Sequence, residues 1–567
     1  MRKKTLFFKL LFTLLFSALS VAGAWGKSAS GIIMMDINLS QQAQGKKVQL
    51  WIPYPESDSE QTISAIKLHG DYAEADVFRD KVFNTPMLYA RWDKDATSRK
   101  LSLSFQAERK EVTRPAFPGE EPKWNPEEYA KYLAPTSLGP IDGEIKKLAE
   151  KITKGKTTVL AKAKAVYDWT VENTFRDPET KGCGIGDVCK LLKKPGGKCA
   201  DISSIYVALA RAAGVPTREI LGIRMGKKEV QDITSWQHCW AEFFLPGHGW
   251  VAVDPADVRK KMLVEKLELK DPKTQEYREY FWGGLDPYRV KLGEGRDLVL
   301  NPPQHGEPVN YLMYPFSQVG EETLDWLDPA AFSYTISFHQ LHKDGYALID
   351  TTTLKKLLDT DPEDLVVVDA RNPEEFQEVH IKGAISVPQK KFKKYADLLP
   401  SEKSARIIFY CNGIKCGKSK KAAKAALEMG YTRIFVYAEG MPVWEEKGMP
   451  IYAGPDYEKR IETDKLSPEE LNTLIQSKAD TFTVVDVRDP EEFQKGHIPG
   501  AINIPSPTFA SQSEVLDKKK QIIVYCSGGG RSYNAYRKLM KLGYKDIRQA
   551  LFFDWQEAGL PVEKSEE

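Results

Sequence analysis

The sequence predicts a multidomain protein with a β-sandwich-like amino-terminal domain, an α+β domain, and two α/β domains with parallel sheets. Three observations predict this fold class. The chain has 567 residues, enough for roughly three to five domains. Its apolar residues first alternate as in strands and then recur at helical spacing. A pattern that begins at Val367 returns at Val484, which indicates an internal duplication.

The composition excludes several classes of protein. Hydrophobic residues make up 42% and charged residues 28%, which is typical of globular domains and excludes wholesale disorder. Lys and Arg number 81 against 79 Asp and Glu, a formal charge of +2, so no basic excess points to nucleic acid. Seven cysteines are too few for a disulfide-built scaffold, and their odd number leaves at least one thiol free.

The first residues have the three parts of an export signal. Arg2, Lys3 and Lys4 form a positive start, Leu10–Ala22 is a mostly apolar run, and Ala22-Gly23-Ala24 is a small-residue cleavage pattern. We expect residues 1–24 to be a secretory signal peptide and the chain to work in the periplasm or outside the cell, where disulfides are permitted. The alternative is an uncleaved membrane anchor, the only membrane contact expected, although the run is shorter than the roughly 20 residues that span a bilayer.

The chain divides into four folded parts. Residues 31–115 alternate as strands, for example Val48–Ile52 and Leu101–Phe105, and predict an antiparallel β domain. Residues 116–342 begin with a Pro-rich surface segment, continue with helices and end in strands, which predicts an α+β domain. Residues 346–455 and 462–565 are the two repeats, each alternating apolar strands with helical stretches, and each predicts a parallel sheet with crossover helices.

One cysteine, one histidine and one aspartate stand where nucleophilic catalysis needs them. Cys199 precedes the predicted helix Ile202–Ala213, and the positive end of a helix dipole lowers the pKa of a thiol there. His238 enters a predicted strand and Asp254 leaves the next one. Because strands joined by a short turn lie side by side, we expect Asp254 near His238, the order of base and orienting group that a thiol nucleophile requires.

Three further cysteines surround this pattern. Strand alternation places Cys239 on the face opposite His238, so we expect it to be an inert core thiol. Cys183 and Cys189 flank a Gly-containing loop that could bend to form a disulfide. A metal pair is the less favoured alternative because no second Cys/His pair lies nearby, and two free thiols remain the third.

These segments resemble the transglutaminase-like superfamily. The resemblance rests on Gly197-Lys198-Cys199, Ala210–Arg218, His238–Glu242 and Gly249–Pro255. It implies a papain-like core in which Cys199 is the nucleophile, His238 the general base and acid, and Asp254 the residue that orients the imidazole. The implied chemistry is acyl transfer from a peptide or protein amide through a thioester, with water as acceptor for hydrolysis or an amine for crosslinking.

The second repeat contains a cysteine loop between a buried-type strand and a helix. Its residues are Cys526, Ser527, Gly528, Gly529, Gly530, Arg531 and Ser532. Three glycines let the backbone N–H groups point inward, the helix start adds positive potential, and Arg531 can form paired hydrogen bonds with an oxyanion. The loop therefore predicts an anion-binding site with a thiolate at its floor, suited to carrying sulfane sulfur.

This loop and its scaffold resemble the rhodanese (thiosulfate sulfurtransferase) family. The scaffold motifs are Asp486-Val487-Arg488, His497–Ala501 and Gly559-Leu560-Pro561. The resemblance implies that Cys526 carries a persulfide, that Arg531 and the loop amides bind the anion, and that a sulfane-sulfur donor such as thiosulfate and a thiol acceptor are the partners. Asp486, Arg488 and His497 lie in the repeated scaffold, so we expect them to be structural.

The first repeat departs from this pattern. Its loop runs from Cys411 to Ser419 and is longer than the loop from Cys526 to Ser532. It has no Arg, and Lys415 and Lys418 are its available cations, so its substrate is expected to differ. Cys411 is the candidate nucleophile, and Cys416 could resolve a persulfide on it or form a disulfide with it. A regulatory or inactive module is the alternative.

Together these patterns predict an exported enzyme with an acyl-transfer thiol and a sulfur-transfer thiol. No metal-binding His spacing and no nucleotide-binding Gly-Lys loop occur in the sequence, so we expect no cofactor and no metal. The rival hypotheses are a non-catalytic binding or scaffold protein, and a protein in which only the rhodanese half is active.

Overall fold

The computed structural model of the protein describes residues 27–360, 365–414, 416–454, 463–477, 480–506 and 508–564. The predicted signal peptide, residues 1–24, lies outside these ranges. Within them no helix combines the length and apolar character that crossing a membrane requires.

The amino-terminal domain consists of two five-stranded antiparallel sheets that share one hydrophobic core. Apolar side chains alternate along the central strands, so that one side of each sheet faces the shared core. The first sheet has the order β10 (Val230–Asp232), β16 (Tyr334–Gln340), β1 (Ser28–Asn38), β6 (Lys100–Lys110) and β3 (Gln61–Gly70). The second has the order β15 (Glu322–Thr323), β14 (Phe316–Val319), β2 (Val48–Pro53), β5 (Pro86–Trp92) and β4 (Glu74–Arg79).

The boundary predicted for this domain is wrong. The segment predicted as 31–115 supplies only six of its ten strands, residues 230–232 supply β10, and residues 316–340 add β14, β15 and β16. Strand β16 pairs with β1 from Gly31 opposite Gln340 to Ile37 opposite Tyr334, which covers an edge that would otherwise expose unpaired backbone groups. The α+β domain predicted for 116–342 is therefore an insertion whose last strands return to the β domain.

The inserted domain packs helices against a four-stranded antiparallel sheet. The sheet order is β12 (Gly249–Val253), β11 (Gln237–Leu245), β9 (Thr217–Arg224) and β13 (Arg289–Glu294). The helices are α1 (Gly143–Ile152), α2 (Val159–Asn173), α3 (Val188–Leu191), α4 (Cys199–Ala212), α5 (Pro255–Glu265) and α6 (Pro272–Tyr280). Every residue of α4 is buried, so this helix and the thiol at its start lie at the centre of the domain.

Each repeat has a parallel sheet with a hydrophobic core on either side. The first sheet has the order β17 (Ala347–Ile349), β22 (Arg433–Tyr437), β21 (Arg406–Tyr410), β18 (Leu365–Asp369) and β20 (Ile385–Ser386). Its helices include α8 (Thr351–Thr360), α9 (Pro373–Glu378), α11 (Lys418–Glu428) and α12 (Gly440–Glu446). The second sheet has the order β25 (Ile502–Asn503), β24 (Phe482–Asp486), β26 (Gln521–Cys526) and β27 (Ile547–Leu551). Its helices include α13 (Pro468–Ser477), α14 (Pro490–Lys495), α16 (Gly530–Lys541) and α17 (Phe552–Glu557).

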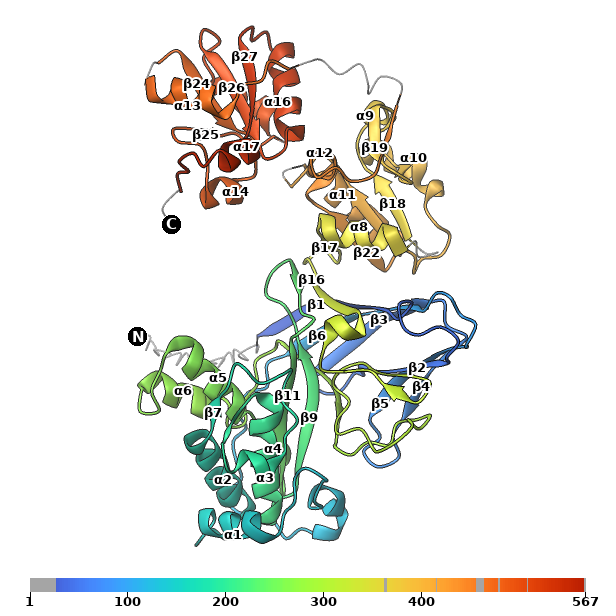
Figure 1. The fold of residues 1–567 in the computed structure, drawn as a ribbon, viewed down its shortest axis with the longest axis vertical. Coiled ribbons are helices and arrows are strands. Elements are labelled where there is room, and N and C mark those ends of the chain that lie inside the picture. Colours follow the sequence, from blue (N-terminus) through green and yellow to red (C-terminus); the bar gives the residue numbers. More distant parts are fainter. Residues whose placement is uncertain are drawn as a thin grey trace, which may run out of the picture.

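The first repeat rests on the first sheet of the β domain (Figure 1). The side chain of Met34 in β1 joins the core of the first repeat. Arg433 donates a hydrogen bond of 3.1 Å to the Ser104 hydroxyl of β6. The ring Nδ1 of His339 lies 2.9 Å from the Leu348 carbonyl. These contacts join the β domain and the first repeat through a buried, partly polar interface.

The scaffold aspartate and arginine of each repeat form a buried ion pair. In the second repeat, the Nε of Arg488 lies 3.0 Å from each carboxylate oxygen of Asp486 and its Nη2 lies 2.6 Å from Oδ2. Arg488 also donates to the Gly496 carbonyl and stacks over Phe552. Asp369 and Arg371 repeat the pair in the first repeat. These residues hold strand ends to helices, which fits the structural role expected for them.

We expect Asp486→Ala to destabilise the second repeat by about 3–5 kcal/mol, because it leaves the buried Arg488 charge without its partner. Differential scanning calorimetry of the full chain measures the transition of this repeat. Lys520→Ala, which removes a pair with the exposed Asp480, is the control and should leave that transition in place. Equal effects of the two substitutions would contradict a stabilising role for the buried pair.

Candidate active sites

Cys199 is the first residue of α4, as the sequence predicts. Asp201 fixes the helix start, because its carboxylate accepts the backbone N–H of Lys198 at 3.1 Å and of Gly186 at 2.9 Å. A side chain at Gly184 or Gly197 would collide with Asp201, and Gly184 also has a left-handed φ of +87°. The two glycines therefore allow the loop that precedes Cys199 to pack closely against the amino terminus of α4.

His238 and Asp254 lie together beside this helix start, as two adjacent strands predict. The ring Nε2 of His238 is 2.7 Å from Oδ2 of Asp254, and both side chains are buried. Asp254 also caps α5, because its Oδ1 accepts the backbone N–H of Asp257 at 2.8 Å. The aspartate is thus held on both carboxylate oxygens, and it fixes the orientation of the imidazole.

Arg289, which sequence reasoning missed, completes the group. Its guanidinium is fully buried and contacts Asp254 directly, Asp257 at 2.7 Å and Asp286 at 3.0 Å. Burial raises the pKa of Asp257, but the charges of Arg224 and Arg289 outweigh it and hold that pKa below its ordinary value. His238, Asp254 and Asp257 are close enough to hold a metal ion, yet the guanidinium already neutralises these carboxylates and would repel a cation.

Three thiols meet at the helix start. The pKa of Cys199 is well below its ordinary value because the Cys183 and Cys239 thiols donate hydrogen bonds to its sulfur and because His238 adds a hydrogen bond and positive charge, against the opposing effect of burial. The expectation that Cys239 points away from the nucleophile is wrong. Alternation holds along β11, but α4 packs on the face that carries Cys239, so Cys239 and Cys199 share one buried cluster.

The disulfide expected between Cys183 and Cys189 does not form. Both are free cysteines: Cys183 is buried and Cys189 is exposed on α3. The Cys183 thiol lies 3.2 Å from the Gln237 carbonyl of β11. It points toward the Cys199 cluster, and the loop that follows turns Cys189 toward solvent.

A cavity of about 230 Å³ opens onto Cys199 and His238. Trp236 and Gln237 form part of its wall. Four cationic side chains line it, and none of the described residues lining it carries a carboxylate: the cations are Arg176, Lys198, Arg224 and Lys260. Positive charge around a thiolate both stabilises the thiolate and attracts anionic groups.

The Cys526 loop surrounds the cysteine sulfur with hydrogen-bonding groups, as the sequence predicts. The Cys526 sulfur lies 3.2 Å from the Gly529 backbone nitrogen, 3.3 Å from that of Ser532 and 3.3 Å from the Ser532 hydroxyl. These contacts favour the thiolate, but burial and the nearby Glu446 charge outweigh them and raise the pKa of Cys526. The expectation that the helix start holds Cys526 ionised is therefore not met.

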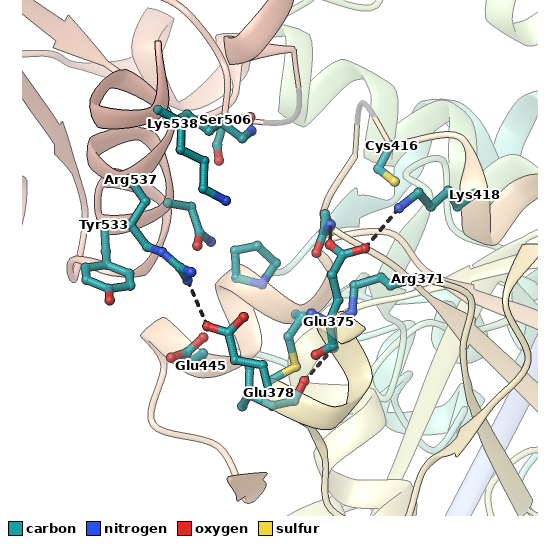
Figure 2. Close-up of a pocket in the computed structure, with 16 residues that line it drawn as sticks. Arg371, Glu375, Glu378, Cys416, Lys418, Glu445, Ser506, Tyr533, Arg537 and Lys538 are labelled. Carbon is teal, nitrogen blue, oxygen red and sulfur yellow. Dashed lines mark hydrogen bonds and ion pairs between the residues drawn. The ribbon is translucent and has the colours of Figure 1, made fainter. Parts of the chain in front are cut away.

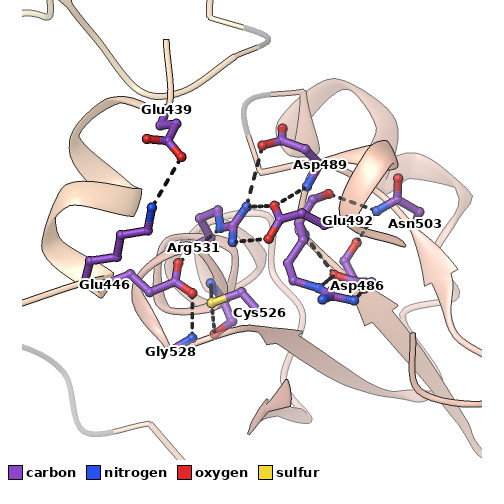
Figure 3. Close-up of polar contacts among 12 residues, drawn as sticks. Glu439, Glu446, Asp486, Asp489, Glu492, Asn503, Cys526, Gly528 and Arg531 are labelled. Atoms are coloured by element: carbon purple, nitrogen blue, oxygen red, sulfur yellow. Dashed lines mark hydrogen bonds and ion pairs between the residues drawn. The ribbon is translucent and has the colours of Figure 1, made fainter. Parts of the chain in front are cut away.

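A carboxylate from the first repeat occupies the anion-binding part of this loop. Glu446, at the end of α12, accepts the Gly528 backbone N–H at 2.5 Å and the Arg531 Nε–H at 3.2 Å (Figure 3). Arg531 also pairs with Glu492 of its own repeat. Gly528 and Gly530 permit this approach, because a Cβ at Gly528 would lie 2.8 Å from the Glu446 Cγ and one at Gly530 would lie 3.0 Å from the Pro442 carbonyl oxygen.

The pocket over Cys526 is strongly acidic. It has a volume of about 890 Å³ and is lined by the loop residues Ser527, Gly528 and Arg531. Seven carboxylates face it, from Glu229, Glu439, Glu446, Asp489, Glu491, Glu492 and Asp554, against two cations, Lys447 and Arg531. An anionic donor must therefore displace Glu446 and overcome this field before it reaches the sulfur.

In the first repeat, the candidate nucleophile Cys411 is buried. Its sulfur lies 3.2 Å from the Ser419 hydroxyl and 3.1 Å from the Cys416 carbonyl, and burial raises its pKa far above the ordinary value. Lys418 pairs with Glu375 at 3.1 Å, so its charge is partly neutralised. Lys415 lies outside the described residues. Cys411 and Cys416 are both free.

Comparisons with known proteins agree with this architecture. The family model of the transglutaminase-like superfamily matches residues 146–255, and the rhodanese-like domain model matches residues 350–447 and 467–550. These matches contain Cys199, His238 and Asp254, and both cysteine loops. The chain thus belongs to the transglutaminase-like superfamily and carries two rhodanese-like domains.

Individual relatives share parts of the chain. A Haemophilus influenzae protein without an assigned function is 35% identical over 325 residues, 53% of this chain and 88% of that protein. A sulfurtransferase of Allochromatium vinosum is 34% identical over 94 residues, 16% of this chain and 88% of that protein. Among solved structures, a candidate cysteine protease from Cytophaga hutchinsonii is 15% identical with a TM-score of 0.35, covering 55% of this chain and 98% of that one.

We expect Cys183→Ala to raise the pKa of Cys199, because it removes a hydrogen bond to a charged sulfur. The pH dependence of Cys199 labelling by iodoacetamide, followed by peptide mass spectrometry, measures this change. Cys183→Ser keeps a donor and should shift the pKa less, and Cys189→Ala, at an exposed position, should not shift it. An unchanged profile for Cys183→Ala would contradict the thiol network.

Proposed function

We propose that this chain is an exported enzyme with two thiol activities: acyl transfer at Cys199 and sulfur transfer at Cys526. For the first activity, the supporting observation is the buried group of Cys199, His238 and Asp254, in which the pKa of the thiol is depressed. The Cys199 thiolate attacks an amide carbonyl, His238 protonates the leaving amine, and Asp254, held in place by Arg289, stabilises the imidazolium. Water or an amine then releases the acyl group from the thioester.

The acyl substrate of this site is a peptide or protein amide with acidic character near the reacting bond. This proposal rests on the four cationic side chains that line the cavity over Cys199. A neutral or acidic group would enter this lining at lower electrostatic cost than a basic one. The Cys199 backbone N–H, the first of α4, is the candidate donor to the oxyanion that forms during attack.

Sulfur transfer at Cys526 follows the chemistry of the relatives named as sulfurtransferases. The Cys526 thiolate attacks the sulfane sulfur of an anionic donor such as thiosulfate, whose S–S bond breaks as sulfite leaves with the electron pair. A thiol acceptor then attacks the outer sulfur of the Cys526 persulfide, takes that sulfur as its own persulfide and releases the Cys526 thiolate. The amide contacts beneath the sulfur support this role. Glu446 occupies the position of the donor anion, so the reaction requires Glu446 to leave the loop.

Export is the part of this proposal that rests on the amino-terminal sequence alone, and the proposed location is the periplasm or the cell exterior. The rival function is a binding or scaffold protein whose cysteines are inert. Labelling of the purified chain separates the two: rapid reaction of Cys199 with iodoacetamide near pH 7 supports an enzyme, and uniformly slow reaction of all the thiols supports a scaffold.

We expect Cys199→Ala to lower amide hydrolysis and crosslinking by at least about 1,000-fold, since the nucleophile of a covalent mechanism is lost. Release of amine from a panel of acidic, neutral and basic peptides measures the loss and the charge preference together. Cys189→Ala is the matched control and should retain full activity. A Cys199→Ala protein with the activities of the parent would remove the acyl-transfer half of the proposal.

We expect Glu446→Gln to lower the KM for thiosulfate by about tenfold or more, because the anion no longer competes with a carboxylate for charge-assisted hydrogen bonds in the loop. Thiosulfate:cyanide turnover measures the effect, and Cys526→Ala provides the background rate. Glu428→Gln removes one charge from an exposed position of α11 and should leave the KM unchanged. An unchanged or raised KM for Glu446→Gln would show that Glu446 does not block the loop.

A further inference from the structure

A second cavity, distinct from the pocket over Cys526, lies between the two rhodanese-like domains (Figure 2). Its volume is about 380 Å³, within the range of about 300–1,000 Å³ that is typical of small-molecule sites. One wall comes from the first domain and includes Glu375, Cys416 and Lys418. The opposite wall is α16 of the second domain, which contributes Arg537 and Lys538. Neither domain alone forms this site.

The longer loop of the first domain places Cys416, and not Cys411, at this cavity. Cys411 directly follows the buried strand β21 and is 1% exposed. The chain then turns, with the Cys416 backbone N–H donating to the Gly413 carbonyl at 2.8 Å. This turn brings Cys416 to the cavity wall, where it is partly exposed. The greater length of this loop thus places a second thiol, that of Cys416, between the buried Cys411 and the cavity.

The surroundings of Cys416 favour its thiolate. The Cys411 thiol donates to the Cys416 carbonyl at 3.1 Å and also interacts favourably with the Cys416 thiolate. The backbone N–H groups of Lys418 and Asn412 and the Lys418 charge add to this effect. These contacts outweigh burial and lower the pKa of Cys416 to about 6. At neutral pH the sulfur is therefore mostly ionised, whereas the Cys411 thiol keeps its proton.

Positive charge from the second domain faces this sulfur. Lys538 donates to the Ser506 carbonyl at 2.8 Å, and among the described residues no carboxylate forms an ion pair with it. Arg537 pairs with Glu378 of the first domain at 2.8 Å across the cavity. Together with Arg371, Lys418 and Lys541, these give five cationic side chains against three carboxylates, Glu375, Glu378 and Glu445. The cavity therefore has the opposite charge balance from the acidic pocket over Cys526.

We propose that Cys416 is the reacting thiol of the first rhodanese-like domain, and that its cavity binds an organic persulfide bearing carboxylate groups, with Lys538 as the cation that attracts it. The cavity volume favours an organic molecule over thiosulfate, and the cationic walls favour an anion. Cys411 acts through Cys416 as a positioning residue, because its thiol contacts the reacting sulfur and not the cavity. The site is independent of sulfur transfer at Cys526.

The reaction is a balanced sulfur exchange. The Cys416 thiolate attacks the outer, sulfane sulfur of the organic persulfide R–S–SH, and a new S–S bond forms as the old one breaks. The electron pair of the broken bond leaves with the inner sulfur as the thiolate R–S⁻, and Cys416 becomes Cys416–S–SH. The transferred sulfur has the same oxidation state in the two persulfides. The exchange therefore needs no external oxidant or reductant.

Persulfide mapping of the full-length Cys526→Ala protein tests which thiol reacts. After brief exposure to glutathione persulfide, alkylation and peptide mass spectrometry should locate the added sulfur on Cys416. Cys416→Ser should lose it without transferring it to Cys411, whereas Cys411→Ser, which keeps a hydrogen-bond donor, should retain it on Cys416. Added sulfur on Cys411 in the parent, or in Cys416→Ser at the parental rate, would overturn the proposal. Because Cys526 is absent, failure of sulfur transfer at that residue cannot produce either result.

A comparison of two alkylating agents tests the cationic site. Iodoacetate is anionic and iodoacetamide is neutral, so Cys416 should prefer iodoacetate more strongly than the exposed Cys189 of the same chain does. Lys538→Gln should lower this preference by about two- to fivefold, the effect of one partly exposed charge, while Lys520→Gln, in the same domain but outside the cavity, should not. Equal preferences at Cys416 and Cys189, or no change in Lys538→Gln, would overturn the assignment of an anion site.

Discussion

A buried thiol ionises only where hydrogen bonds and positive charge offset the loss of hydration, and this constraint separates the cysteines of the chain into two kinds. Cys199 and Cys416 receive hydrogen bonds from neighbouring thiols and charge from His238 or Lys418. At Cys526 and Cys411, burial outweighs the hydrogen bonds to the sulfur and raises the pKa of each thiol. A position at a helix start therefore does not by itself make a thiol reactive.

Two helices connect the sites of the rhodanese-like domains. Helix α12 positions Glu446 at the Cys526 loop. Two other residues of the same helix, Met441 and Pro442, line the Cys416 cavity. Helix α16 begins in the Cys526 loop and ends with Lys538 and Lys541 in that same cavity. A movement of the whole of α12 that withdraws Glu446 from the Cys526 loop would also shift the wall of the Cys416 cavity. The closely packed glycines of the Cys526 loop make this coupling tight, because they leave no space between the loop and α12.

The sequence predicted those parts of the molecule that depend on local pattern. The short turn between β11 and β12 brought Asp254 to His238, and the repeated motifs located the buried pairs of Asp369 with Arg371 and Asp486 with Arg488. The parts it missed depend on approach between distant segments. Arg289 reaches the catalytic group from β13, Glu446 enters the loop of the other repeat, and β16 closes the first β domain. No periodicity or spacing encodes which of these segments become neighbours.

The charge around each thiol sets both its reactivity and its choice of substrate, so the two properties cannot be changed separately. The cations near Cys199 and Cys416 stabilise the thiolate and also attract anionic groups into the same cavities. Around Cys526, burial and the Glu446 charge raise the pKa of the thiol, and the acidic lining of the neighbouring pocket repels anions. Removing Glu446 would relieve both effects at once. In the proposed mechanism, the contact that places Glu446 in the Cys526 loop therefore opposes sulfur transfer at Cys526, while the same two domains together form the cationic cavity at Cys416.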